Sequence, residues 1–283
     1  MALTVNTNTT SLGVQKNLNR ASDALSTSMT RLSSGLKINS AKDDAAGLQI
    51  ATRMTSQIRG QTMAIKNAND GISVAQTAEG AMQEQTNILQ RMRELAVQSR
   101  NDTNSKDDRD ALNKEFAQMS DELSRIAKST QLNGKNLLDG SAGVLTFQVG
   151  SNSGANNQIS ISLDSGFDAA TLSVDSATIA ITGSNSAEAE ASMNAALDAI
   201  DKALQTINTT RADLGASQNR LTSTVNNLQN INENAEAARS RVQDTDFAAE
   251  TAQLTKQQTL QQASTSVLAQ ANQLPSAVLK LLQ

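Results

Sequence analysis

The chain entirely lacks four residue types, since none of its 283 residues is Cys, His, Trp or Tyr. The absence of Cys excludes disulfides and thiolate metal sites, and without His or Cys the common nucleophile–base pairs of enzymes are missing. Aromatic residues make up only 1% of the chain, as four Phe. Large aromatic side chains bury the most area in a compact core. We therefore expect thin helical layers of aliphatic residues and Met, with no enzyme activity, metal or cofactor.

Charge and hydropathy exclude two further classes. The net charge of −4 and the pI of about 5.0 disfavour nucleic-acid binding through a broad basic face. No run approaches the roughly 18 apolar residues of a membrane span. The first ten residues, MALTVNTNTT, lack the basic and apolar regions of a secretory signal peptide. The sequence thus predicts neither membrane insertion nor a cleaved signal peptide.

Both ends of the chain carry helical apolar spacing but few charges. Val14 to Leu36 predicts a first helix, in which Leu18, Leu25 and Leu32 lie seven residues apart. A last helix is expected after Asp246, with one apolar stripe formed by Leu260, Ala263, Val267, Ala271, Leu274, Val278 and Leu282. Thin helix pairs are marginally stable alone. We expect the two ends to pair with each other and to find further partners in other copies of the chain.

Pro275 interrupts the predicted last helix. An interior Pro removes one backbone hydrogen bond and costs about 3 kcal/mol. The sequence therefore predicts a kink or a helix stop near residues 272–274.

The centre of the chain predicts a helical rod. A helix is expected over residues 44–100, and Ser105 with Asp108 predicts the N-cap of an antiparallel third helix. The Asp70-Gly71 pair is a turn signal, but the heptad passes through it in phase and no alternating strands flank it. A long helix over 187–240 carries an apolar residue at every seventh position, namely Met193, Ile200, Ile207, Leu214, Leu221, Leu228 and Ala235. Its expected partner is the 44–100 helix.

The only expected β region lies within residues 131–186, where helical periodicity disappears. Val144–Val149 and Ile159–Leu163 alternate apolar and polar residues, which predicts a hairpin with a long loop. Ala177–Thr182 is expected to add a strand.

Three groups of acidic residues invite a catalytic or metal interpretation. They are Asp43-Asp44, Asp107-Asp108 and Asp244-Thr245-Asp246. Each lies at an expected helix start, where acidic side chains cap the helix, and adjacent helical residues do not face each other. Capping is the favoured interpretation. The segment 90–95, QRMREL, is either a solvated face or an interaction surface.

Several long motifs resemble bacterial flagellin. They are the segment 31–47, RLSSGLKINSAKDDAAG, then NANDGIS at 67–73, LQRMRELAVQ at 89–98, QLNG at 131–134, and the end from Thr245 to Gln283. The resemblance covers about residues 1–150 and 187–283. The central segment does not match strongly, which is typical of a family with variable central domains.

The resemblance implies a mainly α fold: a long antiparallel coiled-coil-like rod (D1), a small β-hairpin region, and a pair of N- and C-terminal helices (D0). Residues 1–43 would form the D0 N-terminal helix and spoke, and 44–140 the first D1 helices. Residues 141–186 would be the hairpin and variable region, 187–241 the D1 C-terminal helix, and 242–283 the spoke and D0 C-terminal helix. Filament core packing would fall to Leu18, Leu25, Leu32, Leu260, Val267, Leu274 and Val278.

The implied function is that of a structural subunit that self-assembles into the extracellular flagellar filament for swimming. Export would use the flagellar type III system. Further partners would be an export chaperone, the filament cap, the hook–filament junction proteins and host receptors. The alternative is a hook–filament junction protein of the same axial structure. Residues 141–186, rich in Ser and Thr, are a candidate segment for O-glycosylation, as found in some members.

The resemblance also implies two immune recognition sites. Thr30–Ala51 resembles the peptide sensed by a plant receptor kinase, with the matching residues Arg31, Leu32, Ser33, Gly35, Ile38, Asn39, Lys42, Asp43, Asp44 and Gly47. Arg91, Leu95, Gln98 and Glu115 match positions that engage the flagellin-sensing toll-like receptor. Arg91 and Glu115 would supply charge-assisted bonds, and Leu95 apolar area. Since Thr30–Ala51 would pair with Val242–Asp246 in a spoke, recognition of the peptide would require free monomer or a released fragment.

Overall fold

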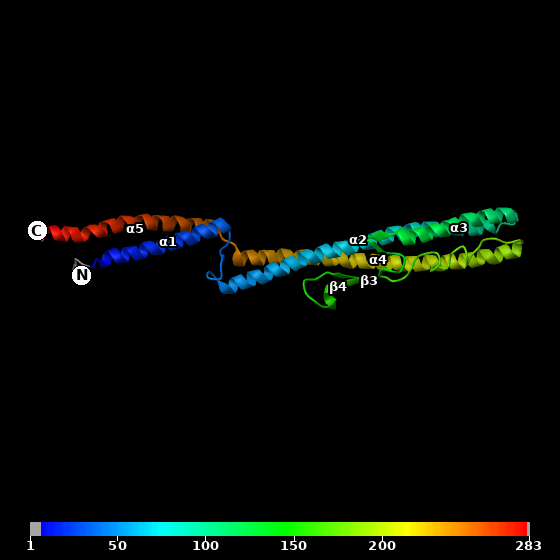
Figure 1. Ribbon diagram of the computed structural model, residues 1–283, viewed down its shortest axis with the longest axis horizontal. Helices are drawn as coiled ribbons and strands as arrows, with labels where there is room; N and C mark the ends of the chain where they lie inside the picture. The colour runs from blue at the N-terminus through cyan, green and yellow to red at the C-terminus, as the bar shows by residue number, and fades with distance from the viewer. Residues whose placement is uncertain (1–6, 282–283) are drawn as a thin grey trace. The chain divides into compact units, whose positions relative to one another are not determined.

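The computed structural model describes the backbone of residues 7–281 and the side chains of residues 7–273. Its elements are five α-helices, two pairs of short strands and one 3-10 turn (Figure 1). They divide into two compact units, one of residues 1–58 with 233–283 and one of residues 59–232. Within the described range, no helix is both long and apolar enough to cross a membrane.

The first unit contains α1 (Thr9–Ser34) and α5 (Phe247–Leu281). The side chain of Asn8 caps α1 by accepting the backbone N–H of Ser11, so the helix begins five residues before the predicted Val14. Gly35 ends α1 in a left-handed conformation, φ 73°, in which a residue without Cβ is favoured. The predicted helix stop near Pro275 is wrong, because α5 continues through it to Leu281. The loss of one backbone hydrogen bond does not require a helix to end.

The second unit is built on α2 (Ala45–Ser99), α3 (Lys106–Ser129) and α4 (Ser186–Gln243). The ends of α2 and α4 extend into the first unit. Arg93 pairs with Asp201 and Arg100 with Glu190, so numbers rise along α2 as they fall along α4 and the helices are antiparallel. Asp70-Gly71 lies inside α2, as predicted. Ser105 and Asp108 form the predicted capping box at the start of α3.

Four short strands form two antiparallel pairs in the second unit. β3 (Gly143–Gln148) and β4 (Gln158–Leu163) form the predicted hairpin, joined by a loop that contains η1 (Ala155–Asn157). β1 (Gln131–Leu132) and β2 (Lys135–Asn136) form a smaller hairpin that was not predicted. Its turn residues, Asn133 and Gly134, have positive φ values of 50° and 76°. An Asn-Gly pair at a two-residue turn is a known hairpin signal.

The predicted strand over Ala177–Thr182 is absent, and this segment forms turns and irregular backbone. The side chain of Asp175 accepts the backbone N–H groups of Ala177 and Thr178, which closes a turn where a strand would begin. Ile179 and Ile181 are nevertheless buried. The segment therefore covers part of the hydrophobic core without pairing as a strand.

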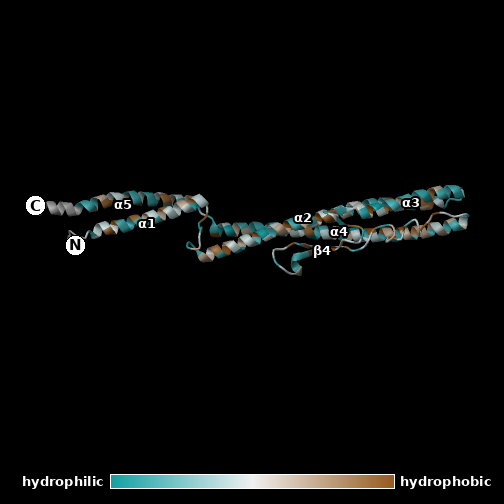
Figure 2. Cartoon of the chain, viewed as in Figure 1, coloured by the Kyte–Doolittle hydropathy of each residue, from teal (hydrophilic) through white to brown (hydrophobic). Residues whose placement is uncertain are grey.

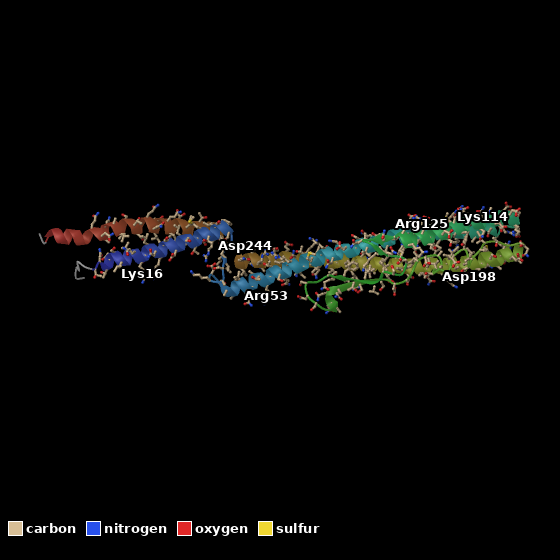
Figure 3. All side chains as sticks on the ribbon, in the orientation of Figure 1. Lys16, Arg53, Lys114, Arg125, Asp198 and Asp244 are labelled. Atoms are coloured by element: carbon tan, nitrogen blue, oxygen red, sulfur yellow. The ribbon has the colours of Figure 1, made fainter. Side chains whose placement is uncertain are left out.

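One continuous hydrophobic core lies in the second unit, and α2, α3, α4, the hairpins and the irregular segment 164–183 all contribute to it. Its largest fully buried side chains include Phe116, Phe167, Met82, Leu89, Leu123 and Ile181. Gln85 is fully buried, and its amide donates to the carbonyl oxygen of Phe167 at 2.8 Å, which ties the irregular segment to α2. Charged side chains such as Lys114, Arg125 and Asp198 lie on the exposed surface of α3 and α4 (Figure 3).

Candidate assembly and recognition surfaces

The α1–α5 pair confirms that the two ends of the chain pack on each other. The helices are antiparallel: Ser11 Oγ lies 2.8 Å from Asn272 Oδ1 at one end, and Arg31 forms an ion pair with Glu250 at 3.6 Å near the other. The residues that α1 buries are small, namely Ser11, Ala21 and Ser28. The predicted residues Leu18, Leu25 and Leu32 are half-buried on the same side. Figure 2 shows few strongly hydrophobic residues along either helix.

The predicted stripe of α5 largely faces away from α1. Leu260 and Val267 are 45% and 47% exposed, so α1 does not cover them in the monomer, and their predicted part in filament core packing stays a prediction. The residues that α5 turns towards α1 instead alternate three and four apart and are mostly polar or small: Leu254, Gln257, Gln261, Ser264, Leu268 and Ala271. The alternation of three and four residues is a sequence signal for a helix face that packs on a neighbour. It is hard to recognise here because most residues at these positions are polar or small. Leu274 and Val278 lie outside the described side chains.

Two backbone hydrogen bonds join the segments that follow α1 and precede α5. Lys37 N–H donates to the carbonyl oxygen of Gln243 at 2.7 Å, and Thr245 N–H donates to that of Gly35 at 3.0 Å. Leu36 and Asp244 thereby form an isolated antiparallel bridge. The structure thus pairs Thr30–Ala51 with Val242–Asp246, as the sequence predicted.

The loop after this bridge is organised by Asn39 and Asp43. The Asp43 carboxylate accepts the backbone N–H groups of Ser40 at 2.9 Å and Asn39 at 3.1 Å, and also the Ser40 hydroxyl. These hydrogen bonds, the one from the Ser40 backbone first, lower the pKa of Asp43 below its ordinary value. The Asn39 side chain donates to Ser34 Oγ at 2.8 Å. The loop is therefore held by its own polar residues.

Ile38 and Gly47 fix the start of α2 against this loop. Ile38 is only 4% exposed. A Cβ on Gly47 would lie 2.5 Å from Asp44 Oδ2 and 2.6 Å from Ile38 Cδ1, so no larger residue fits without a shift. Asp44 in turn accepts the backbone N–H of Gly47 at 2.9 Å. Of the predicted recognition residues, Ser33, Asn39, Lys42, Asp43 and Asp44 are exposed, and Arg31, Leu32 and Gly35 are half-buried.

The surface predicted for receptor contact on α2 and α3 is only partly formed as expected. Arg91 Nη2 and Nε donate to Glu115 Oε1 at 2.8 and 3.1 Å, and Arg91 Nη1 donates to Glu94 at 2.9 Å. These bonds raise the pKa of Arg91. Gln98 is exposed. Leu95, however, is fully buried, so its predicted role of offering apolar area is wrong: it faces the core between the helices.

The remaining acidic groups cap helices. Asp108 belongs to the α3 capping box, which lowers its pKa through the hydrogen bond from Ser105. Asp246 accepts the backbone N–H groups of Ala248 and Ala249 at the start of α5. Across the residues that the structure describes, no cluster of three or more acidic side chains could hold a metal ion.

Comparison with known proteins identifies the family. Residues 5–143 match the model of the bacterial flagellin N-terminal helical region, and residues 197–282 match that of the C-terminal helical region. The polar flagellin C of Vibrio parahaemolyticus is 40% identical, and the alignment covers 100% of both chains. The chain belongs to the bacterial flagellin family.

The central segment distinguishes this chain from that Vibrio flagellin. The alignment spans 385 positions against the 283 residues of this chain. Residues 144–196 lie outside both flagellin family models. This is a short flagellin, in which the central variable region is reduced.

Two solved structures resemble the chain. A flagellin from Bacillus cereus is 33% identical, with coverage of 58% of this chain and 88% of that one and a TM-score of 0.47. A protein described as flagellar hook-associated, from Vibrio parahaemolyticus, is 13% identical, with coverage of 71% and 100% and a TM-score of 0.58. At that identity the second likeness concerns the fold alone, and it does not favour a junction protein.

Membership of the flagellin family fixes the general function. The chain is a structural subunit of the bacterial flagellar filament, the extracellular structure used for swimming. Its assembly is homopolymeric, as in other flagellins.

Proposed function

We propose that the α1–α5 pair is the part of this flagellin that forms the inner layer of the filament, D0, with residues 1–43 and 242–283. Residues 44–140, 141–186 and 187–241 form the outer layer, D1. The two units of the fold support a division of this kind, although their limits fall at residues 58 and 232. The bridge at Leu36 and Asp244 supports a two-stranded spoke between the layers.

The observation that carries the proposal is the exposed apolar row on α5. Leu260 and Val267 lie seven residues apart and therefore share one helix face, and each is nearly half exposed. The described part of α5 up to Gln273 has only two charged residues, and one of them, Glu250, is paired with Arg31. A solvated helix normally has a charged outer face. The row is therefore suited to contact with another subunit.

A double substitution, Leu260→Glu with Val267→Glu, tests the proposal. Two carboxylates on this row would be buried unpaired in the assembly, whereas both positions are exposed in the monomer. We expect normal monomer helicity by circular dichroism and no filaments by electron microscopy after salt-induced assembly. Lys256→Glu is the matched control, because it places an acid on α5 at an exposed position that already carries a charge.

Filaments of normal length from the double variant would contradict the proposal. If the glutamates disturbed the monomer, Leu260→Ser with Val267→Ser would remove the same apolar area without adding charge. Normal filaments from that variant would count against the proposal equally.

Export and capping follow from the proposed place in the filament. The subunit leaves the cell through the flagellar type III channel. Its partners on the way are an export chaperone, the hook–filament junction proteins and the filament cap. The support for these partners is the family relationship.

Host recognition rests on Arg91, Gln98 and Glu115 for the toll-like receptor, and on the exposed residues of Thr30–Ala51 for the plant receptor. Since exposed ion pairs contribute little stability, Arg91→Ala with Glu115→Ala should leave the fold intact and lower receptor signalling about tenfold or more. The exposed pair Arg93 and Asp201, changed to Ala in the same way, is the control. Unchanged signalling in a reporter-cell assay would contradict this surface.

A further inference from the structure

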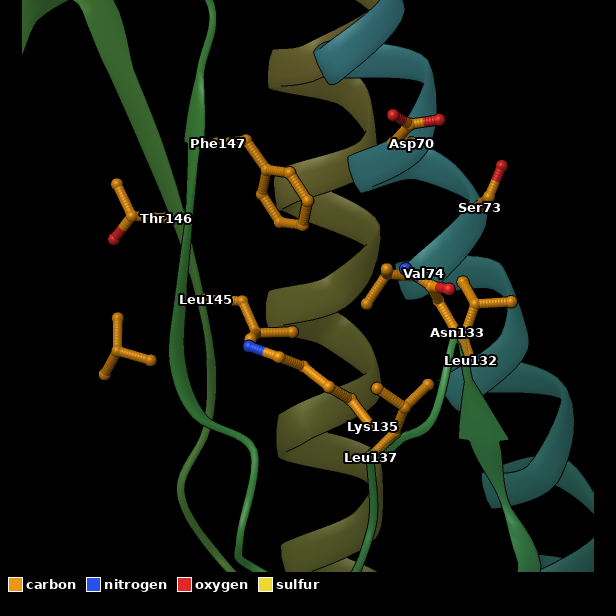
Figure 4. Close-up of a pocket in the computed structure, with 11 residues that line it drawn as sticks. Asp70, Ser73, Val74, Leu132, Asn133, Lys135, Leu137, Leu145, Thr146 and Phe147 are labelled. Atoms are coloured by element: carbon orange, nitrogen blue, oxygen red, sulfur yellow. The ribbon is translucent and has the colours of Figure 1, made fainter.

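A groove of about 620 Å³ lies in the second unit, between the two hairpins and over α2 (Figure 4). Its walls are the β1–β2 hairpin on one side and β3 on the other. Its apolar lining comes from Val74, Leu132, Leu137, Leu145 and Phe147. A cavity of this size, mostly apolar with a few polar groups, is typical of ligand-binding sites. The apolar lining residues also belong to the core or pack against it, but the proposed assembly through α5 does not use the groove.

One wall of the groove is the unpaired edge of a strand. β3 pairs with β4 along its whole length, from Gly143 with Leu163 to Gln148 with Gln158. No residue of β4 lines the groove, so the groove lies along the other edge of β3. In the described part of the chain no second strand pairs with that edge. Backbone groups on such an edge are a template for an added strand.

Two side chains of opposite charge line the groove. Asp70 on α2 lies level with Phe147, and Lys135 on β2 extends towards Leu145 (Figure 4). Neither forms an ion pair within residues 7–273. Phe147 and Leu145 are two residues apart on β3, and residues at this spacing point to the same side of a strand. The groove thus carries one acidic and one basic side chain, together with Leu145 and Phe147 of β3.

We propose that this groove binds an extended peptide segment of another protein as a strand added to β3, with a basic side chain beside Asp70 and an acidic side chain two residues away beside Lys135. Backbone hydrogen bonds to the free edge of β3 would bind any extended segment, whatever its sequence. The apolar lining and the two charges select a segment in which apolar residues alternate with one residue of each charge.

Synthetic pentapeptides test the proposal with the full-length protein. The probe Val-Lys-Val-Asp-Val carries both charges and Val-Lys-Val-Lys-Val carries two positive ones; each is labelled and titrated by fluorescence anisotropy. We expect the unsubstituted protein to bind the mixed-charge probe about tenfold more tightly, because the second probe places a lysine beside Lys135. Binding should also slow hydrogen exchange of the backbone amides of β3.

Lys135→Glu sharpens the test, because the groove then carries two negative charges. The preference should reverse in favour of the probe with two lysines, whether the peptide lies parallel or antiparallel to β3. Lys128→Glu, at an exposed position of α3 outside the groove, should leave the preference unchanged. Failure of the unsubstituted protein to bind either probe, or an unchanged preference in Lys135→Glu, would overturn the proposal.

Discussion

The two units of this flagellin bury different kinds of side chain between their helices. In the α1–α5 pair the buried residues are Ser, Ala and Gln. Every described large apolar side chain of this unit is at least partly exposed, apart from Ile38 and Ile58 in the segments that adjoin the pair. In the second unit, Phe, Met, Leu and Ile side chains form one continuous core, and many of them are fully buried. Small side chains allow two helices to approach closely, but they remove little apolar area from water.

The difference in apolar burial determines which unit is stable without contacts to other subunits. Apolar burial supplies about 25 cal/mol per Å², so the second unit has a large source of stability within its own chain. The helix pair has a thin core and keeps Leu260 and Val267 on its surface. We infer that the pair obtains the rest of its stability from contacts between subunits.

Truncation of Phe116 is the change expected to have the largest effect on this comparison. Phe116 is fully buried in the second unit, and Phe→Ala at such sites costs about 3–5 kcal/mol. Leu25→Ala, at a half-buried site of α1, should lower the free energy of unfolding of its unit by only roughly 1 kcal/mol. Native-state hydrogen exchange of the amides of α3 and α1 measures the two losses separately. Equal losses would refute the contrast between the units.

A smaller effect is expected from Gly47→Ala, which tests whether the first unit has any site of tight packing. The added methyl group would collide with Asp44 and Ile38, and overpacking of this kind costs about 1–3 kcal/mol. Gly13→Ala is the control, since nothing lies within 4 Å of its added Cβ and helix propensity rises by about 1 kcal/mol. Thermal unfolding should give a lower midpoint for the first variant and an equal or higher one for the second. A stabilised Gly47→Ala protein would show that this loop is as loosely packed as the helix pair.

Local signals in the sequence predicted most helix boundaries and the main hairpin. Ser105 and Asp108 marked the start of α3 because a capping box satisfies backbone N–H groups within four residues. The heptad through Asp70-Gly71 correctly outweighed the turn signal. A helix that continues through this pair keeps its apolar face continuous and buried, which stabilises it. The prediction of a further strand was wrong because of Asp175. Its side chain closes a turn, and such a turn competes directly with strand pairing.

Surface placement could not be predicted to the same extent. Helical periodicity shows which residues share a face, but not which of two apolar faces meets the neighbouring helix. On α5 the conspicuous row of Leu260 and Val267 turned outwards, and the polar row of Gln257 and Gln261 turned inwards. Leu95 matched a recognition surface by position, yet its side of α2 faces the hydrophobic core. Such outcomes depend on partners far away in the sequence.

The bridge between Leu36 and Asp244 has a consequence for the order of assembly. It closes a loop of about two hundred residues, so α1 and α5 meet each other at the effective concentration of a tethered pair, which is in the millimolar range for short tethers. The bridge therefore holds α1 and α5 together as a pair within one subunit. A neighbouring subunit then encounters one composite surface in a single event, and the entropy of bringing its two halves together has already been lost within the subunit.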